Sequence, residues 1–161
     1  MVDSLYKKVV ARQPLATPDR KIFGPYLSKK LLRGIDANDA CGREWHRQNP
    51  DPNLKPPDAL LEFGIFSGDE EESEPQAFHI EKTDIEKDGS YRVHVKLTRE
   101  FPSYKLVWHV AAVVVPENGR PVVDDMVYLK DDEHDTDERL SEILSQERAS
   151  ICQVKDHNLF R

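Results

Sequence analysis

The chain opens with an amphipathic pattern. Its apolar residues recur at i, i+3, i+4, i+7 and i+8, which places them on one stripe of an α-helix. We predict a first helix that ends before Pro14 and Pro18, because proline disrupts a helix interior. The stripe consists of Val2, Leu5, Tyr6, Val9 and Val10.

A second helix is predicted to begin after Ser28, whose hydroxyl can accept a hydrogen bond from an N–H of the first turn. Leu31, Leu32 and Ile35 repeat the apolar stripe, and the pattern extends past two glycines towards Trp45. We expect this helix to pack beside the first one as a lid over the rest of the protein.

The periodicity changes after residues 49–58, where four of ten residues are proline and a rigid connector is expected. Residues 78–80 form a short alternating run. Residues 91–98 alternate between apolar and polar side chains, which predicts a strand with one buried face and one wet face. Asp88-Gly89 is a typical hairpin turn before that strand.

The segment 106–115 is apolar at both odd and even positions. Asn118-Gly119 then turns the chain into residues 121–129, so that three consecutive antiparallel strands form a meander.

A last helix is predicted after Thr136, which can cap it, with Asp137 in the positive first turn. Its apolar stripe would contain Leu140 and Leu144. Helices first and a meander afterwards indicate an α+β fold with an antiparallel sheet, because a parallel sheet needs alternating β-α-β units.

These elements resemble the nuclear transport factor 2-like (cystatin-like) superfamily, and more narrowly a bacterial family of that fold whose function is unknown. The resemblance rests on the opening helix, the strand 108–115, the turn 117–120 and the strand 122–128. It implies a cone, in which a curved antiparallel sheet wraps around the N-terminal helices and leaves a pocket at its open end.

The superfamily includes ketosteroid isomerases, dehydratases, transport-factor binding modules and immunity proteins, so its shape does not select a function. We expect one domain over residues 1–161. Residues 2–129 would form the cone-like core, and residues 130–161 an acidic linker, a helix and a tail.

Composition is that of one soluble domain: 161 residues, 38% hydrophobic and 33% charged, without an apolar run long enough for membrane insertion. Residues 1–50 carry ten Lys/Arg and five Asp/Glu, and residues 51–161 carry thirteen and twenty-five. These local charges of +5 and −12 give the net charge of −7. The acidic excess argues against nucleic-acid binding.

Two cysteines, Cys41 and Cys152, are too few for a disulfide scaffold, and their spacing does not suggest a metal site. They can form one bridge in an exported protein or stay as thiols in a reducing compartment. No signal-like stretch follows Met1. Localisation is therefore periplasmic or exported if a signal peptide has been removed, and cytoplasmic otherwise. No cofactor is expected.

Candidate catalytic residues are His109 and Asp125, with Tyr6 and Tyr26 as donors. An isomerase in a cone needs a base and hydrogen-bond donors in a dry pocket, where negative charge develops. His109 shares its strand face with apolar neighbours, so we expect it to be either a pocket acid or base or a hydrogen-bonded core or interface histidine. Asp125 is either a pocket base or a partner of a helix residue.

A binding surface is the better supported alternative. Trp108, Val110 and Val114 lie on the other face of the same strand, and we expect this face to need a second cover if helices cover only one side. A homodimer that pairs sheet faces would supply it, and so would the proline-rich connector or the tail. Asp124 points away from Asp125, and one of the two should approach the helices.

We therefore favour a noncatalytic binding or protein-interaction domain that uses the cone pocket or a sheet face, with an immunity-like role as one form. The acidic runs 69–74 and 131–138 suit a basic protein partner, and a small apolar ligand is the other candidate. The alternative function is a small-molecule isomerase or lyase with His109 and Asp125 in the pocket. Signatures for covalent hydrolases or nucleotide binding are absent from the sequence.

Overall fold

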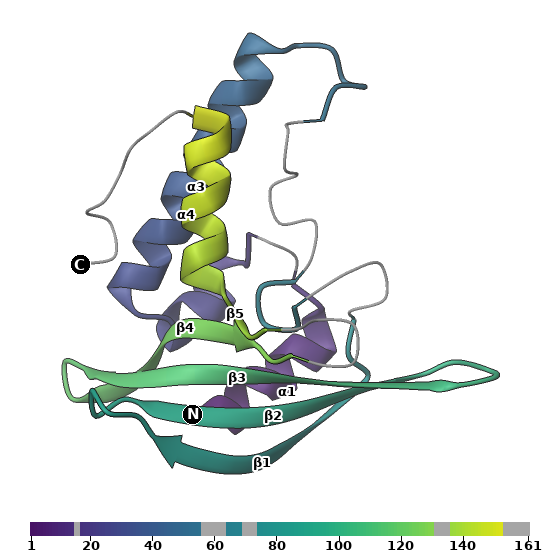
Figure 1. Cartoon of the computed structure of the whole chain (residues 1–161), viewed down its shortest axis with the longest axis vertical. Coiled ribbons are helices and arrows are strands. Elements are labelled where there is room, and N and C mark those ends of the chain that lie inside the picture. Colours follow the sequence, from purple (N-terminus) through teal and green to yellow (C-terminus); the bar gives the residue numbers. More distant parts are fainter. Residues whose placement is uncertain (15–16, 56–63, 69–73, 131–135, 153–161) are drawn as a thin grey trace.

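The computed structural model has an α+β fold and describes residues 1–14, 17–55, 64–68, 74–130 and 136–152 (Figure 1). The helices within these residues are α1 (Val2–Arg12), α2 (Arg20–Phe23), α3 (Lys29–Gln48) and α4 (Leu140–Cys152), with a short 3-10 turn η1 (Gly24–Tyr26) after α2.

The sheet has five strands in the order β1-β2-β3-β4-β5, and every neighbouring pair is antiparallel. The prediction of an α+β fold with an antiparallel sheet and a C-terminal helix is confirmed. The strands are β1 (Ala77–Ile85), β2 (Tyr91–Glu100), β3 (Lys105–Glu117), β4 (Arg120–Tyr128) and β5 (Glu138–Arg139).

The local sequence patterns predicted α1, α3 and the hairpin turns correctly. The Ser28 hydroxyl accepts a hydrogen bond from the Leu31 N–H at 3.0 Å, as predicted for the start of α3. Both predicted hairpin turns form, with positive φ at Gly89, Asn118 and Gly119. Positive φ is the conformation that glycine and asparagine tolerate best.

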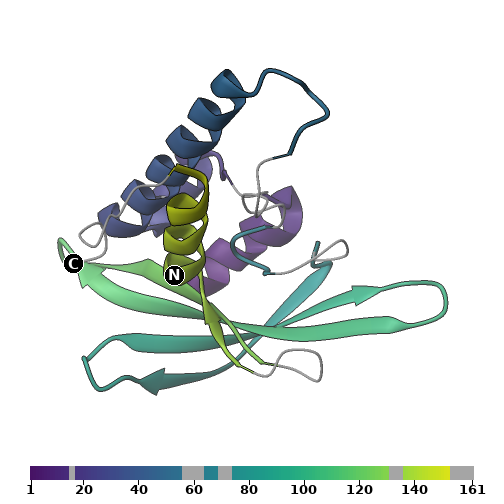
Figure 2. The ribbon, with the colours of Figure 1, turned by 45° about the horizontal axis from the view of Figure 1, so that its top comes forward.

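The helices lie on one side of the sheet (Figures 1 and 2). We call the sheet face towards them the inner face and the opposite one the outer face. α3 and α4 run side by side and rise away from the sheet, and the disulfide Cys41–Cys152 joins them. Of the two states expected for the cysteines, the bridge is the one present.

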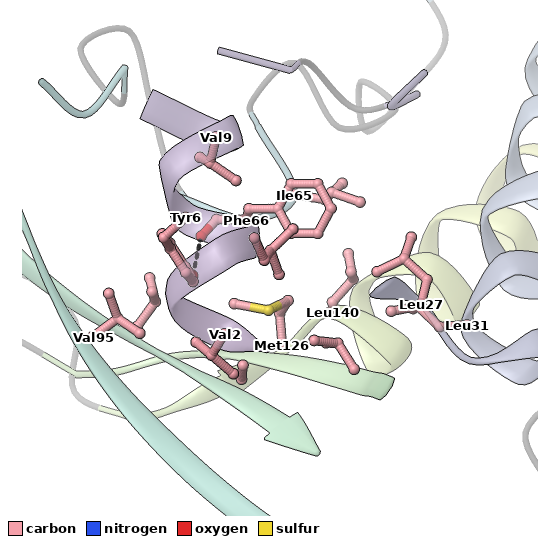
Figure 3. Close-up of a cluster of buried hydrophobic side chains, with 14 of the residues drawn as sticks. Val2, Tyr6, Val9, Leu27, Leu31, Ile65, Phe66, Val95, Met126 and Leu140 are labelled. Carbon is pink, nitrogen blue, oxygen red and sulfur yellow. Dashed lines mark hydrogen bonds between the residues drawn. The ribbon is translucent and has the colours of Figure 1, made fainter. Parts of the chain in front are cut away.

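The main hydrophobic core fills the space between α1, the inner face and the first turns of α3 and α4 (Figure 3). Val2 and Tyr6 lie between α1 and the sheet residues Val95 and Met126, and Val9 lies further along α1, towards residues 64–68. All five are nearly or completely inaccessible to solvent, so α1 is held by apolar burial as its sequence pattern predicts.

The start of the last helix differs from the prediction. Thr136 does not cap it, because Glu138 and Arg139 pair with β4 as the short strand β5 and the helix begins only at Leu140. Ladder hydrogen bonds to β4 thus replace the expected first turn, and a carboxylate from β4, Asp125, binds the helix end instead. Residues 49–55 contain no helix or strand, as predicted, whereas 56–58 lie outside the described residues.

Candidate functional site

The two faces of β3 are reversed relative to the prediction. Val110, Ala112 and Val114 belong to the main core on the inner face, and Trp108 packs against it. The protein's own helices cover this face, so the expected need for a second cover was wrong. The β2 residues that pair with Trp108, Val110 and the other residues of this face are the buried apolar residues of β2, as Val95 opposite Val110 shows. Because paired residues of neighbouring strands share a face, Trp108 and Val110 must lie on the inner face.

His109 therefore lies on the outer face. Its side chain is 44% exposed, and its Nε2 is 3.6 Å from a carboxylate oxygen of Glu81. Val107, two residues earlier on the same face, is 45% exposed. The apolar neighbours predicted for the face of His109 are present in Ala111 and Val113, but the helices cover the opposite face. Because β3 is apolar in both phases, alternation alone could not show which face the helices cover.

Asp125 is buried on the outer face, opposite Val113. Its Oδ1 accepts hydrogen bonds from the N–H groups of Ser141 at 3.0 Å and Met126 at 2.9 Å, and its Oδ2 accepts one from the Ser141 hydroxyl at 2.6 Å. Arg139 adds a charge at 3.5 Å. These contacts attach Asp125 to the N-terminus of α4, so its partners are structural.

Asp124 is the extra residue of a bulge in β4, between the pairs of Val123 and Asp125. Its carboxylate binds Lys30 of α3 at 2.8 Å. The expectation that one of the two aspartates approaches the helices holds for both of them, with Asp124 at α3 and Asp125 at α4.

The structure does not bring the four candidate catalytic side chains together. Asp125 of β4 pairs with Val113, which is four residues from His109 along β3, or roughly 13 Å at the rise of a strand. Tyr6 of α1 is buried against the inner face of the sheet and donates a hydrogen bond to the Phe66 carbonyl at 2.7 Å. Tyr26 shares an exposed hydrogen bond of 2.8 Å with Ser4.

Residues 64–68 form an inner segment that sequence reasoning missed. Tyr128 donates to the Ile65 carbonyl at 2.9 Å, and Trp108 donates to the Ser67 carbonyl at 2.7 Å. With Tyr6, this makes three aromatic donors on three consecutive carbonyls of one segment. The signal available in the sequence was a pair of large apolar residues, Ile65 and Phe66, enclosed by Gly64 and Gly68.

Burial controls the ionisation of these phenols. It raises the pKa of Tyr6 far above its usual 10.0, and it does the same for Tyr128, with smaller contributions from Tyr6 and nearby carboxylates. Both hydroxyls therefore act as neutral donors that fasten the chain to itself.

The outer face is polar over β1 and β2. His94 binds Asp84 at 2.8 Å, and Arg92 lies 2.5 Å from Glu86 and 3.6 Å from Asp137. The hydrogen bond from Lys82 is the main reason why the pKa of Asp84 is lowered. A small second apolar cluster lies on this face and consists of Ala111, Val113 and Val127, with Leu129 against it.

The tip between β2 and β3 extends beyond the helices (Figures 1 and 2). Phe101 and Tyr104 stack there with 4.5 Å between ring centroids, and the Arg99 guanidinium lies 5.0 Å from the centre of the Phe101 ring. Tyr104 and nearby Val107 are each nearly half exposed. We call Phe101, Tyr104, Val107 and His109 the hairpin surface.

Within the described residues, no group of three or more histidine, cysteine or acidic side chains is arranged to bind a metal ion. In the same part of the chain, no helix combines the length and apolarity required to cross a bilayer. The acidic segments 69–73 and 131–135 lie outside the described residues. No protein-family model, curated protein or solved structure matches the chain.

Proposed function

We propose that this protein is a noncatalytic protein-binding domain and that the hairpin surface contacts the partner. The observation that carries the proposal is the stacked aromatic pair Phe101–Tyr104 on a hairpin that projects past the helices, next to the exposed Val107. Aromatic residues and arginine contribute a large share of binding energy at protein interfaces, and a prestacked pair loses little entropy when it is buried.

The placement of the polar side chains supports binding rather than catalysis. Asp125 is engaged by Ser141, and Tyr6 is engaged by the Phe66 carbonyl. An isomerase or lyase that uses His109 with Asp125 would have to break the cap of α4 before the two groups met. We therefore retain that activity only as the less favoured alternative.

The partner we propose is a basic protein. The net charge of −7 would steer a basic surface towards the domain and speed association. An immunity-like role, in which an acidic protein neutralises a basic toxin, is the form of this proposal that fits the charge best. The disulfide Cys41–Cys152 favours an exported or periplasmic location, since such bridges persist in oxidising compartments.

The resemblance to the nuclear transport factor 2-like superfamily, with its cone shape and pocket, belongs to this proposal too. The open meander with α1 packed on the inner face is compatible with it. In such a cone the space beneath α1 would be occupied by the 64–68 segment, whose carbonyls accept the bonds from Tyr6 and Tyr128.

Site-specific photocrosslinking in the cells of origin tests the proposal. A photoreactive residue at Val107 should yield one discrete crosslinked protein of basic isoelectric point, whereas the same residue at exposed Arg43 on α3 should not. Replacement of Tyr104 by Ala in the Val107 probe protein should reduce the yield. Native mass spectrometry that finds a retained small molecule, with no crosslink at Val107, would reject the proposal and return weight to a pocket function.

A further inference from the structure

The two edges of the sheet differ in how they are paired. On the β4 side, Leu27 forms a bridge with Val123, and β5 pairs with the other end of the strand. On the opposite side, β1 is the terminal strand, and no described strand pairs with its outer edge (Figure 1). A nine-residue strand with a free edge presents unpaired N–H and C=O groups that can accept another strand.

A bulge divides β1 into two halves. Ile80 pairs with Val95 and Lys82 pairs with His94, so Glu81 is the extra residue. The Glu81 carboxylate reaches His109 on the outer face, which places Glu81 and Lys82 on the same face although they are neighbours in sequence. The alternation of faces therefore changes phase at the bulge. As a result, the order of inner-face and outer-face residues that leads away from the bulge is the same in both halves of β1.

The free hydrogen-bonding groups follow the same symmetry. The Glu86 N–H bonds the Ser90 carbonyl at 2.9 Å, so this pair and every second pair along β2 exchange hydrogen bonds. Counting from that pair, the backbone groups that point to the free edge belong to Ile85 and Thr83 after the bulge, and to Ile80 and Phe78 before it.

We propose that the free edge of β1 binds the same edge of a second copy, with a two-fold axis between Glu81 and Lys82. In this antiparallel register Ile80 faces Thr83 of the second copy and Phe78 faces its Ile85. All four residues of each copy whose backbone groups point to the free edge then pair with such residues of the other copy. The inner faces of the two sheets lie on the same side of the combined sheet. The bulge makes this possible, because in an unbroken strand an axis between two residues would join opposite faces.

The side chains are complementary in the same register. Glu81 faces Lys82 of the second copy, and His79 faces its Asp84, so each contact joins opposite charges or a histidine and a carboxylate. Lys82 is 61% exposed and pairs with Asp84 of its own strand at 2.8 Å, so in the dimer it would exchange this partner for Glu81 of the second copy. Ile85, which is 74% exposed in one copy, gains an apolar neighbour in Phe78 of the other.

Bulges and lysines commonly protect sheet edges against pairing, and here they make one pairing fit. The dimer forms a continuous ten-stranded sheet and uses the edge of β1 rather than the tip between β2 and β3. Phe101, Tyr104 and Val107 of the hairpin surface therefore lie outside the contact, whereas His109 borders it through Glu81. Two copies would present two partner sites in one assembly.

Sedimentation velocity of the full chain, from about 5 to 500 µM, measures the dimer directly. Lys82→Glu places Glu opposite Glu twice and should weaken the dimer by about tenfold or more. The double swap Glu81→Lys with Lys82→Glu should restore it to within about threefold of the original, since the two-fold axis makes the exchanged charges complementary again. Arg43→Glu on α3 is the matched charge-reversal control and should leave the dimer unchanged.

Thr83→Pro supplies a second, backbone-level test. It removes an N–H that points to the free edge rather than to β2, so the monomer should fold and the dimer should be lost. Amide hydrogen exchange should show protection of Ile80 and Thr83 that grows with protein concentration. A monomer at all concentrations, or a dimer that survives both Lys82→Glu and Thr83→Pro, overturns the proposal. A dimer lost on Val107→Arg but not on Thr83→Pro would also overturn it, in favour of pairing through the outer face.

Discussion

Asp125 on β4 accepts hydrogen bonds from both the backbone N–H and the hydroxyl of Ser141 in the first turn of α4. The first N–H groups of a helix lack partners within the helix and carry a partial positive charge. A carboxylate from a strand supplies both a hydrogen-bond acceptor and the opposite charge. The contact explains why Asp125 can be buried and how α4 is attached to the sheet.

Replacement of Asp125 by Ala should lower the free energy of unfolding by about 2 to 3 kcal/mol, because buried donors at the helix end lose their acceptor. Asp124→Ala is the matched control on the neighbouring residue. Its partly exposed pair with Lys30 should be worth about 1 kcal/mol or less. Urea unfolding of both variants measures the difference, and equal losses would contradict the assigned role of Asp125.

The strand pattern and the turn residues predicted most of the fold because each is a local property. The alternation in residues 91–98 defined β2, and the two glycine-containing turns defined the hairpins β1–β2 and β3–β4. The face of β3 could not be assigned in the same way, since both of its phases are apolar. Only its pairing with β2 shows that Val110 points inward and His109 outward.

The candidate site depended on contacts that have no local signature. β5 has two residues, which is too short for a periodic pattern, and its pairing with β4 brings Ser141 to Asp125. The segment 64–68 is neither helix nor strand, so its place beneath Tyr6 and Tyr128 follows from tertiary packing alone. Residue types could nominate Asp125 and Tyr6 as candidates, but not identify their partners.

The disulfide Cys41–Cys152 should contribute strongly to stability, because it closes a long loop in the unfolded chain. The two residues are 111 apart in sequence, for which the chain-entropy model gives about 4 to 5 kcal/mol. Cys41→Ser with Cys152→Ser should lower the unfolding free energy by about 3 to 5 kcal/mol. Non-reducing peptide mapping verifies the bridge. If a reductant left the unfolding curve of the native chain unchanged, the assignment would be incorrect.

Stability should fall in alkaline solution. Burial raises the pKa of Tyr6 and Tyr128 above their usual 10.0, so both stay protonated in the folded state while they ionise in the unfolded chain. Their contribution is complete below pH 10 and is lost as pH rises further, by about 1.4 kcal/mol per pH unit for each tyrosine.

Tyr6→Phe should remove one tyrosine's share of this alkaline slope and cost about 1 kcal/mol at neutral pH through the lost bond to Phe66. Tyr91→Phe, at a side chain that is 46% exposed, is the control and should leave the slope unchanged. Denaturant unfolding at several values between about pH 9 and 11 gives the slopes. A slope that Tyr6→Phe does not alter would mean that the phenol ionises alike in both states.

Gly68 should tolerate alanine worse than Gly89 does, although both have positive φ, 66° and 84°. A Cβ at Gly68 would lie 2.5 Å from Cδ1 of Tyr128, whereas one at Gly89 meets nothing within 4 Å. The Tyr128 ring cannot simply move, because its hydroxyl is bonded to the Ile65 carbonyl. We expect Gly89→Ala to cost about 1 kcal/mol from backbone strain alone, and Gly68→Ala about 3 kcal/mol or more from strain and overpacking together. Urea unfolding of the two variants measures both costs, and similar values would show that residues 64–68 are not held against Tyr128.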